Sequence, residues 1–259
     1  MTDNKIITDR EEMLETLKYD PSRLEYASDT LKDDREVVLE AVKENGHYLK
    51  YASDTLKDDR EFVLKVLTNT DWDTSDALQY TSDSLKDDRK VVLEFVRANG
   101  RMLDYASDTL KADREVVIEA IRNNALVLEY ADDTLKADRE VVLEAIRHDD
   151  FRGGALQYVS DTLWINREFV LEAVRNNGSA LEYADDTLKA DREVVLEAVR
   201  NDGNALQYAE DTLKADREVV LEALNDDGHV LDYSPLQFAN IKFTSDPEKM
   251  LEALKIDPE

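Results

Sequence analysis

A segment of 25 residues recurs along almost the whole chain, and this repetition constrains the fold more than any other feature. Successive copies align on an arginine, and these arginines lie 25 residues apart except for spacings of 29 after Arg60 and 28 after Arg139. A tyrosine nine residues before the arginine completes eight pairs: Tyr26/Arg35, Tyr51/Arg60, Tyr80/Arg89, Tyr105/Arg114, Tyr130/Arg139, Tyr158/Arg167, Tyr183/Arg192 and Tyr208/Arg217. Tandem units of this length are typical of solenoids, in which each unit packs on its neighbours.

The second half of each copy has the pattern of an amphipathic helix. Val141 pairs with Ala145 and Val142 with Ile146 at four-residue spacing, while the charged residues fall on the opposite side. A strand would place charged residues on both faces, so the helical interpretation is favoured. Asp138 is the expected N-cap of this helix.

The first half of each copy is shorter, and Leu128 to about Asp132 is expected to form a short helix and a turn. Burying the apolar side chains of one such helix pair contributes roughly 10 to 20 kcal/mol. Ordering its residues costs about 1.5 kcal/mol each, so a single pair is not stable alone. We therefore predict an all-α fold, an α-solenoid formed by a superhelical stack of two-helix repeats of about 25 residues.

We expect one continuous helical-repeat domain over residues 1–259. A cap helix is predicted at 1–22, regular repeats at 23–233 with insertions near 70–76 and 149–154, and an irregular C-terminal cap at 234–259. The seven glycines all lie in the connection from a long helix to the next short one. They are expected to serve as left-handed C-caps.

The charge of the chain restricts its partners. Sixty acidic and 33 basic residues give a formal net charge of −27. Direct binding to nucleic acid or to an anionic membrane is not expected, because both need a cationic surface. The sequence has no cysteine and no apolar run of membrane-spanning length. Its first residues have no apolar core of signal-peptide length, so no signal peptide is expected. A cytoplasmic monomer is the default expectation.

The recurring motif YASDTLKxDREVVLEAVxxNG resembles the tandem repeat of the family called domain of unknown function 4116. The resemblance extends from about Asp9 to Leu254. It implies helical repeats and no established activity. The chain departs from the motif at Lys65 and Lys90, which stand at positions usually occupied by Glu, and at Trp164-Ile165-Asn166, which replaces Lys-Ala-Asp.

The recurrent arginine lies in the first turn of the long helix, where the helix dipole disfavours a cation. We expect each arginine to contact acidic residues of the adjacent repeat or the tyrosine, whose ring would lie between repeats with its hydroxyl at a polar edge. The alternative is a row of arginines that binds anions. The predicted structural ladder includes Tyr105, Arg114, Tyr130, Arg139, Tyr183 and Arg192.

The two insertions interrupt the pattern at the same type of corner and are candidate contact sites. Together with the tryptophan that replaces a usual lysine, they supply three large aromatic residues outside the core pattern. One interpretation is a patch that contacts a protein partner. The other is that the longer loops fold back over local packing. The candidate partner-binding residues are Trp72, Asp73, Phe151, Arg152 and Trp164.

No motif predicts catalysis, a metal or a cofactor. The segment from Asp71 to Asp76 begins like a calcium loop but has neither the glycine at the sixth position nor the glutamate at the twelfth. The three histidines, His47, His148 and His229, are expected to be solvated. The predicted function is a non-enzymatic scaffold that presents an extended acidic surface to a basic protein or peptide. The alternative is a nucleic-acid mimic that occupies the site of a DNA- or RNA-binding protein.

Overall fold

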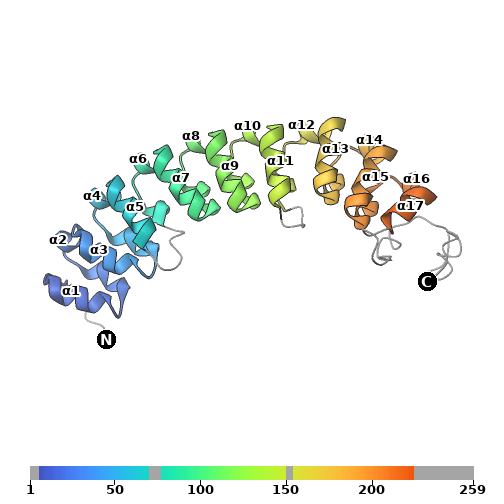
Figure 1. Ribbon diagram of the computed structural model, residues 1–259. Helices are drawn as coiled ribbons and strands as arrows, with labels where there is room; N and C mark the ends of the chain where they lie inside the picture. The colour runs from blue at the N-terminus through green and yellow to red at the C-terminus, as the bar shows by residue number, and fades with distance from the viewer. Residues whose placement is uncertain (1–5, 70–76, 150–153, 225–259) are drawn as a thin grey trace. The chain divides into compact units, whose positions relative to one another are not determined.

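The computed structural model describes residues 6–69, 77–149 and 154–224. The chain divides into two compact units, residues 1–132 and 133–259, and each unit consists of stacked helical repeats (Figure 1). The single continuous domain expected over residues 1–259 stays a prediction, and the expected C-terminal cap lies outside the described residues.

Each complete repeat contains three helical elements: a 3-10 helix, an α-helix of about one turn and a long α-helix. In the first unit the 3-10 helices are η1 (Pro21–Tyr26), η2 (Gly46–Tyr51), η3 (Ala77–Tyr80), η4 (Gly100–Tyr105) and η5 (Ala125–Tyr130). The short α-helices are α2 (Asp29–Lys32), α4 (Asp54–Lys57), α6 (Asp83–Lys86) and α8 (Asp108–Lys111). The long α-helices are α1 (Arg10–Leu17), α3 (Arg35–Val42), α5 (Arg60–Asn69), α7 (Arg89–Ala98) and α9 (Arg114–Asn123).

The second unit continues the same order. Its 3-10 helices are η6 (Leu156–Tyr158), η7 (Gly178–Glu182) and η8 (Gly203–Tyr208). Its short α-helices are α10 (Asp133–Lys136), α12 (Asp161–Trp164), α14 (Asp186–Lys189) and α16 (Asp211–Lys214). Its long α-helices are α11 (Arg139–His148), α13 (Arg167–Asn176), α15 (Arg192–Asn201) and α17 (Arg217–Ala223). The all-α repeat fold is as predicted, but the first half of a repeat is two helical pieces rather than one.

The capping of the long helices is repetitive. The side chain of Asp138 accepts hydrogen bonds from the amides of Glu140 and Val141, so it is the N-cap predicted for α11. An aspartate does the same for α3, α7, α9, α15 and α17. Asn166 replaces it at α13 and accepts from the amide of Phe169. Each long helix therefore begins at its arginine.

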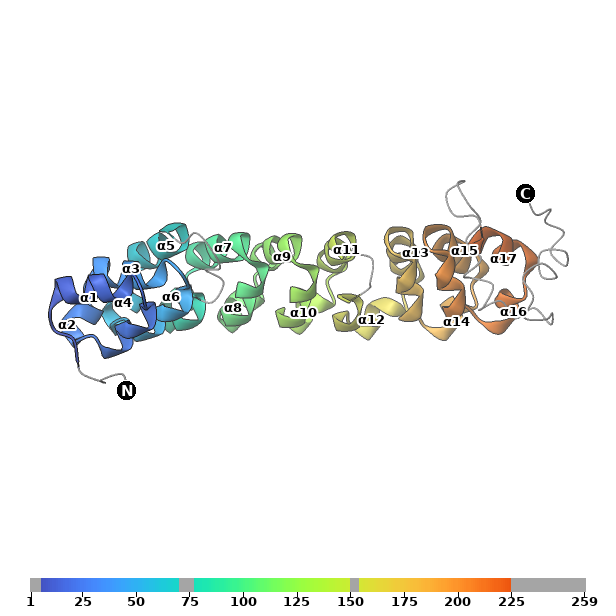
Figure 2. The same ribbon diagram turned by 90° about the horizontal axis from the view of Figure 1, so that it is seen from below.

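The apolar stripe of each long helix forms the core. Val141, Val142, Ala145 and Ile146 are all buried, as the four-residue spacing predicts. Within each unit the long helices pack against one another and against the 3-10 helices. Figure 2 shows the long helices along one side of each unit and the short helices along the other.

A ladder of backbone hydrogen bonds joins consecutive short helices. The amide of Ser107 donates to the carbonyl oxygen of Lys86 at 3.0 Å, and that of Glu210 donates to Lys189 at 3.0 Å. These carbonyls end their helices and have no partner within them, so the next repeat satisfies them. At the start of the ladder, the carbonyl of Ile7, which precedes the first helix, accepts from the amide of Ser28 at 2.9 Å. Equivalent bonds are Ser53 to Lys32, Ser82 to Lys57, Asp132 to Lys111, Ser160 to Lys136 and Asp185 to Trp164.

Gly100 and Gly178, which follow long helices, are not left-handed C-caps, contrary to the sequence prediction. The residue that ends α13 is Asn177, which has an extended backbone with φ of −151°. Gly178 instead lies so close to the next repeat that an added Cβ would be 2.6 Å from the carbonyl oxygen of Ala198. Gly100 meets Ala120 in the same way. These glycines permit close approach between repeats.

Over residues 6–69, 77–149 and 154–224 the backbone forms one isolated bridge, between Ile7 and Ala27, and no strand. None of the helices in those ranges combines the length and the apolar character needed to cross a membrane.

Candidate interaction surface

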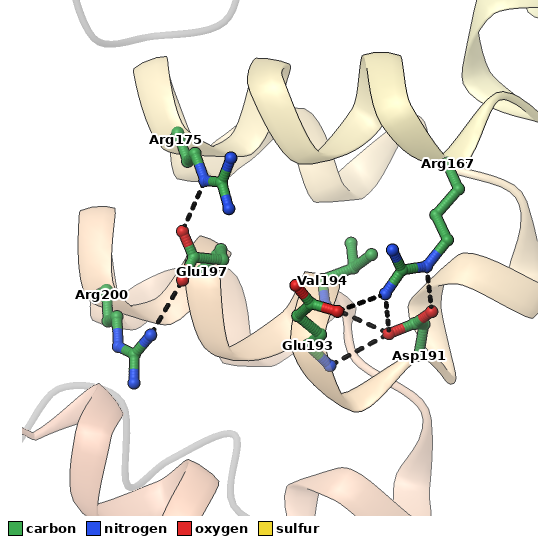
Figure 3. Close-up of polar contacts among 7 residues, drawn as sticks. All are labelled: Arg167, Arg175, Asp191, Glu193, Val194, Glu197 and Arg200. Carbon is green, nitrogen blue, oxygen red and sulfur yellow. Dashed lines mark hydrogen bonds and ion pairs between the residues drawn. The ribbon is translucent and has the colours of Figure 1, made fainter.

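In six of the long helices, α1, α3, α5, α7, α13 and α15, the arginine that begins the helix forms an ion pair with the start of the next long helix. Arg167 Nε lies 2.7 Å from Asp191 Oδ2, and its Nη2 lies 2.6 Å from Glu193 Oε2 (Figure 3). The same aspartate caps α15, so one carboxylate serves both its own helix and the preceding repeat. Equivalent pairs join Arg10 to Asp34 and Glu36, Arg35 to Asp59, Arg60 to Asp88, Arg89 to Asp113 and Glu115, and Arg192 to Asp216 and Glu218.

Arg139 departs from this arrangement. The equivalent cap of the next long helix is Asn166, which carries no charge. Arg139 Nη2 instead contacts Glu172 Oε2 at 2.7 Å, and Arg147 Nη2 lies 3.4 Å from the other carboxylate oxygen. The contact still joins consecutive repeats of the second unit. Arg114, the remaining arginine of the predicted ladder, begins α9 with an exposed side chain.

A second ladder of ion pairs joins the C-terminal ends of the long helices. In the second unit, Arg175 Nε contacts Glu197 Oε2 at 2.6 Å, and Glu197 Oε1 in turn contacts Arg200 Nη1 at 2.8 Å (Figure 3). Arg200 continues to Glu222 at 2.8 Å. Arg97 and Glu119 form the equivalent pair in the first unit at 3.2 Å. This ladder was not predicted, although the recurring LEAVR segment contains both partners.

The ladders keep their carboxylates ionised. The hydrogen bond from Arg167 lowers the pKa of Asp191, and that from Arg89 does the same for Asp113. Arg175 is the main cause of the lowered pKa of Glu197. Because each of these arginines is engaged within the chain, the anion-binding alternative gains no support from these contacts.

Two long helices, α9 and α15, each end with an asparagine whose side chain hydrogen-bonds to the preceding repeat. Asn201 Oδ1 accepts from the amide of Gly178 at 2.6 Å, and its Nδ2 donates to the carbonyl of Arg175 at 3.0 Å. Asn123 makes the same two contacts with Gly100 and Arg97. Each asparagine side chain thereby provides hydrogen-bond partners for backbone groups at the end of the preceding long helix, where the helix itself provides none.

The motif tyrosines end the 3-10 helices, or directly follow the helix in the case of Tyr183, and they are half-buried, among them Tyr105 and Tyr130. The hydroxyl of Tyr51 donates to Glu25 Oε2 of the previous repeat at 3.4 Å. Burial raises the pKa of Tyr130 and Tyr183. The hydroxyl of Tyr51 thus meets a carboxylate of the neighbouring repeat, as the amphipathic nature of tyrosine predicts.

Trp164 lies in the core rather than on a surface. Its side chain is only 4% exposed, stacks on Tyr183 at 5.6 Å between centroids and meets Phe169 edge-on. This burial argues against its expected role as an exposed contact residue. The other four candidate partner-binding residues, Trp72, Asp73, Phe151 and Arg152, lie outside the described residues, as does the calcium-like segment.

His47 is half-buried and makes specific contacts, whereas His148 is exposed, as expected. His47 Nε2 lies 2.7 Å from Lys50 Nζ, and its ring meets that of Tyr80 edge-on at 5.0 Å. His148 lies 3.6 Å from Glu144. Groups of three or more potential metal ligands are absent from the part of the chain that the structure describes. His229 lies outside that part.

The surplus negative charge lies away from the ladders. The repeat from Glu193 to Arg217 has six acidic and three basic residues. Three of its carboxylates, on Glu193, Glu197 and Asp216, contact ladder arginines. The others belong to Asp202, Glu210 and Asp211, which cap or begin the 3-10 and short helices. We call this side of the repeats, formed by the 3-10 and short helices, the acidic edge.

The family model described as Domain of unknown function (DUF4116) matches six overlapping or adjacent stretches of the chain: residues 9–57, 34–73, 59–111, 113–151, 138–189 and 191–235. Neither the curated proteins nor the solved structures include a match. Because the matched stretches cover most of the sequence and follow the repeats, the chain belongs to the DUF4116 family.

Proposed function

We propose that this chain is a non-enzymatic binding scaffold whose acidic edge receives a basic protein or peptide. One observation carries the proposal: the two ladders engage the arginines of the long helices, while carboxylates such as Glu182 and Asp202 accumulate on the opposite elements. A surface with one dominant sign of charge steers an oppositely charged partner and favours its binding.

The short helices favour a protein partner over nucleic-acid mimicry. Five of the lysines that end short helices lie near the aspartate that begins the same helix, for example Lys136 and Asp133 at 3.4 Å. Lys57, Lys86, Lys189 and Lys214 repeat this arrangement. A regular cation interrupts any continuous row of carboxylates, and an imitation of the phosphate backbone needs such a row.

The proposal is tested by titrating the full chain into a fluorescein-labelled peptide of alternating arginine and glycine and measuring anisotropy. A peptide with glutamate in place of arginine is the control. We expect the arginine peptide to bind at low salt, with an affinity that falls as salt rises. Absence of binding at low salt, or equal binding of the glutamate peptide, would contradict the proposal.

A further inference from the structure

One histidine joins the second repeat to the third through its ring nitrogens. His47 lies in η2, and its Nε2 is 2.7 Å from Lys50 Nζ of the same helix. Its Nδ1 is hydrogen-bonded to the hydroxyl of Tyr80 in η3, and the two rings meet edge-on with centroids 5.0 Å apart. All three side chains are half-buried. Both nitrogens of the imidazole are therefore in use.

The sequence of the repeats explains why a histidine contacts the tyrosine here. The hydroxyl of Tyr51 donates to Glu25, which is the residue before the motif tyrosine of the first repeat. For Tyr80 the equivalent residue of the preceding repeat is Lys50, whose ammonium cannot accept a hydrogen bond. The imidazole of His47 takes the tyrosine instead. A ring that can change its charge thus stands where the previous pair of repeats uses a carboxylate.

The two contacts fix where the proton of the neutral imidazole lies. A lysine ammonium is only a donor, so Nε2 must accept from Lys50. The single N–H of the neutral ring is then on Nδ1, and it donates to the hydroxyl oxygen of Tyr80. This tautomer is assigned from the partners of the ring.

A second proton on His47 is incompatible with the contact to Lys50. It would place an N–H on Nε2, so that two cations, both of them donors only, would face each other at 2.7 Å. Like charges repel strongly at this distance, and the lysine must leave. The N–H on Nδ1 is present in both charge states, so the hydrogen bond to Tyr80 is kept.

The neighbouring elements place no carboxylate against the ring. The helix η2 packs against η1, α3 and η3. Tyr48 of η2 meets the imidazole edge-on at 6.4 Å between centroids, and Glu44, which precedes η2, is exposed. Within residues 6–69, 77–149 and 154–224, His47 forms no ion pair. Charged groups of the adjoining elements have partners of their own, namely Glu25 with Tyr51, Arg23 with Tyr26, and Glu40 with Lys43.

We infer that His47 is a pH-sensitive switch on the acidic edge. In its neutral state it holds the ammonium of Lys50 beside the imidazole, where Nζ also lies 4.7 Å from the centre of the Tyr51 ring. In its protonated state it expels Lys50 and keeps Tyr80. Histidine is the side chain that ordinarily changes its charge between pH 5 and 8. The contact with Lys50 is therefore present at about pH 8 and lost towards pH 5, whether or not a partner occupies the acidic edge.

Nuclear Overhauser effects in the full chain, labelled with ¹³C in lysine, histidine and tyrosine, test the switch. We expect an effect between the Cε protons of Lys50 and the ring of His47 at pH 8, and its loss as the ring signals of His47 report protonation. The effect between the rings of His47 and Tyr80 should persist, which shows that the two repeats stay packed. Lys50→Gln and His47→Gln assign the signals, and His148→Gln, which removes an exposed histidine of the other unit, should change none of them. A ring that takes up no proton above pH 5, or one that does so with the Lys50 contact intact, would overturn the inference.

Urea unfolding of Lys50→Gln gives an independent test. Glutamine stands at the equivalent position of three other repeats, and circular dichroism checks that the variant is folded. The substitution removes a hydrogen bond at pH 8 but relieves a repulsion at pH 5. We expect it to raise the equilibrium constant for unfolding by about fivefold at pH 8 and by less than about twofold at pH 5.

Two comparisons isolate His47 as the cause. Lys57→Gln removes another lysine of the acidic edge, which lies 3.7 Å from Asp54, and its effect should be the same at both pH values. In a His47→Gln background the residue facing Lys50 stays neutral, so the effect of Lys50→Gln should no longer depend on pH. An effect of Lys50→Gln that is equal at pH 8 and pH 5 in the otherwise unmodified chain, or a pH dependence that survives His47→Gln, would refute the switch.

Discussion

Arg167 and Asp191 join two consecutive repeats through an ion pair, with Nε and Oδ2 2.7 Å apart. Asp191 also accepts hydrogen bonds from the amides of Glu193 and Val194 at the start of α15. The residue that caps a long helix is therefore also the residue that binds the arginine of the preceding repeat. Local helix formation and inter-repeat packing are coupled at this carboxylate, as a repeat protein without a stable single unit requires.

Replacing Asp191 with asparagine should make part of the stability independent of pH. Arg167 lowers the pKa of Asp191 in the folded chain. A carboxyl with a lowered folded-state pKa stabilises the fold above its unfolded pKa of about 3.9 and loses this contribution as pH falls through the folded value. We expect Asp191→Asn to be less stable than the unmodified chain at pH 7, with the difference closing below about pH 4.

Urea unfolding at a series of pH values measures this difference. Asparagine can still cap the helix, as Asn166 does at α13. Asp186→Asn is the control, because the side chain of Asp186 is 99% exposed and its lysine lies 3.9 Å away. A difference for Asp191→Asn that stays constant from pH 7 to pH 2 would show that the ion pair does not contribute.

Asn201→Ala should destabilise the second unit by about 1 to 2 kcal/mol, because it leaves the buried amide of Gly178 without its acceptor. Asn176→Ala is the matched control. Asn176 occupies the equivalent position of α13 but donates to Glu172 in its own helix. Chemical denaturation of both variants distinguishes the roles, and equal losses would show that the contact with the preceding repeat contributes nothing.

Gly178→Ala should cost about 1 to 3 kcal/mol through overpacking. The added methyl group would lie 2.6 Å from the backbone carbonyl oxygen of Ala198, so the two repeats must move apart. Ser179→Ala, one residue later, should change the free energy of unfolding by less than about 0.5 kcal/mol. A Gly178→Ala variant as stable as the unmodified chain in urea would refute the close-approach explanation.

Trp164→Ala should lower the free energy of unfolding by about 3 to 5 kcal/mol, the usual cost of removing a buried aromatic side chain. Trp164→Lys should cost less, since seven repeats have lysine at this position. Thermal unfolding of the two variants provides the comparison. If alanine is tolerated as well as lysine, the packing of Trp164 on Tyr183 is not stabilising.

The long helices could be predicted from the sequence because their information is local. The spacing of Val141 and Ala145 defines one helical face, and Asp138 marks its start. The first half of the repeat was harder, because apolar residues three apart suit a 3-10 helix as well as an α-helix. The segment predicted as a short helix from Leu128 to about Asp132 is the end of the 3-10 helix η5, and α10 follows as a separate turn.

Features that depend on the next repeat could not be predicted from one copy. Gly178 is required by the carbonyl of Ala198, which lies 20 residues later in the chain. The burial of Trp164 follows from its position, since lysine there already has a sheltered side chain that is 21% exposed at Lys57 and 25% at Lys189. A lysine side chain can lie along an apolar surface with its charge in water, so a lysine in the sequence does not reveal that the position is partly buried.

The acidic partners of Arg192 could be anticipated, because a cation at a helix start needs an offsetting charge. The exception at Arg139 could have been found from Asn166, the neutral residue at the position of the usual aspartate. Which carboxylates are paired with an arginine, and which are not, could be determined only from the contacts in the structure. Glu193 and Glu210 are both acidic residues near helix starts, and only Glu193 lies against an arginine.

The central claim is that a basic partner binds the acidic edge and not the ladders, and two triple variants with equal loss of charge test it most directly. The first carries Glu182→Gln, Asp202→Asn and Glu210→Ser, all residues found at equivalent positions of other repeats. The second carries Glu193→Gln, Glu197→Gln and Glu218→Gln, which removes three ladder carboxylates. The measurement is the Kd of the arginine–glycine peptide at low salt. We predict that the first variant weakens binding by about tenfold and the second by less than about threefold. Equal weakening by both, or a greater effect of the second, would contradict the account.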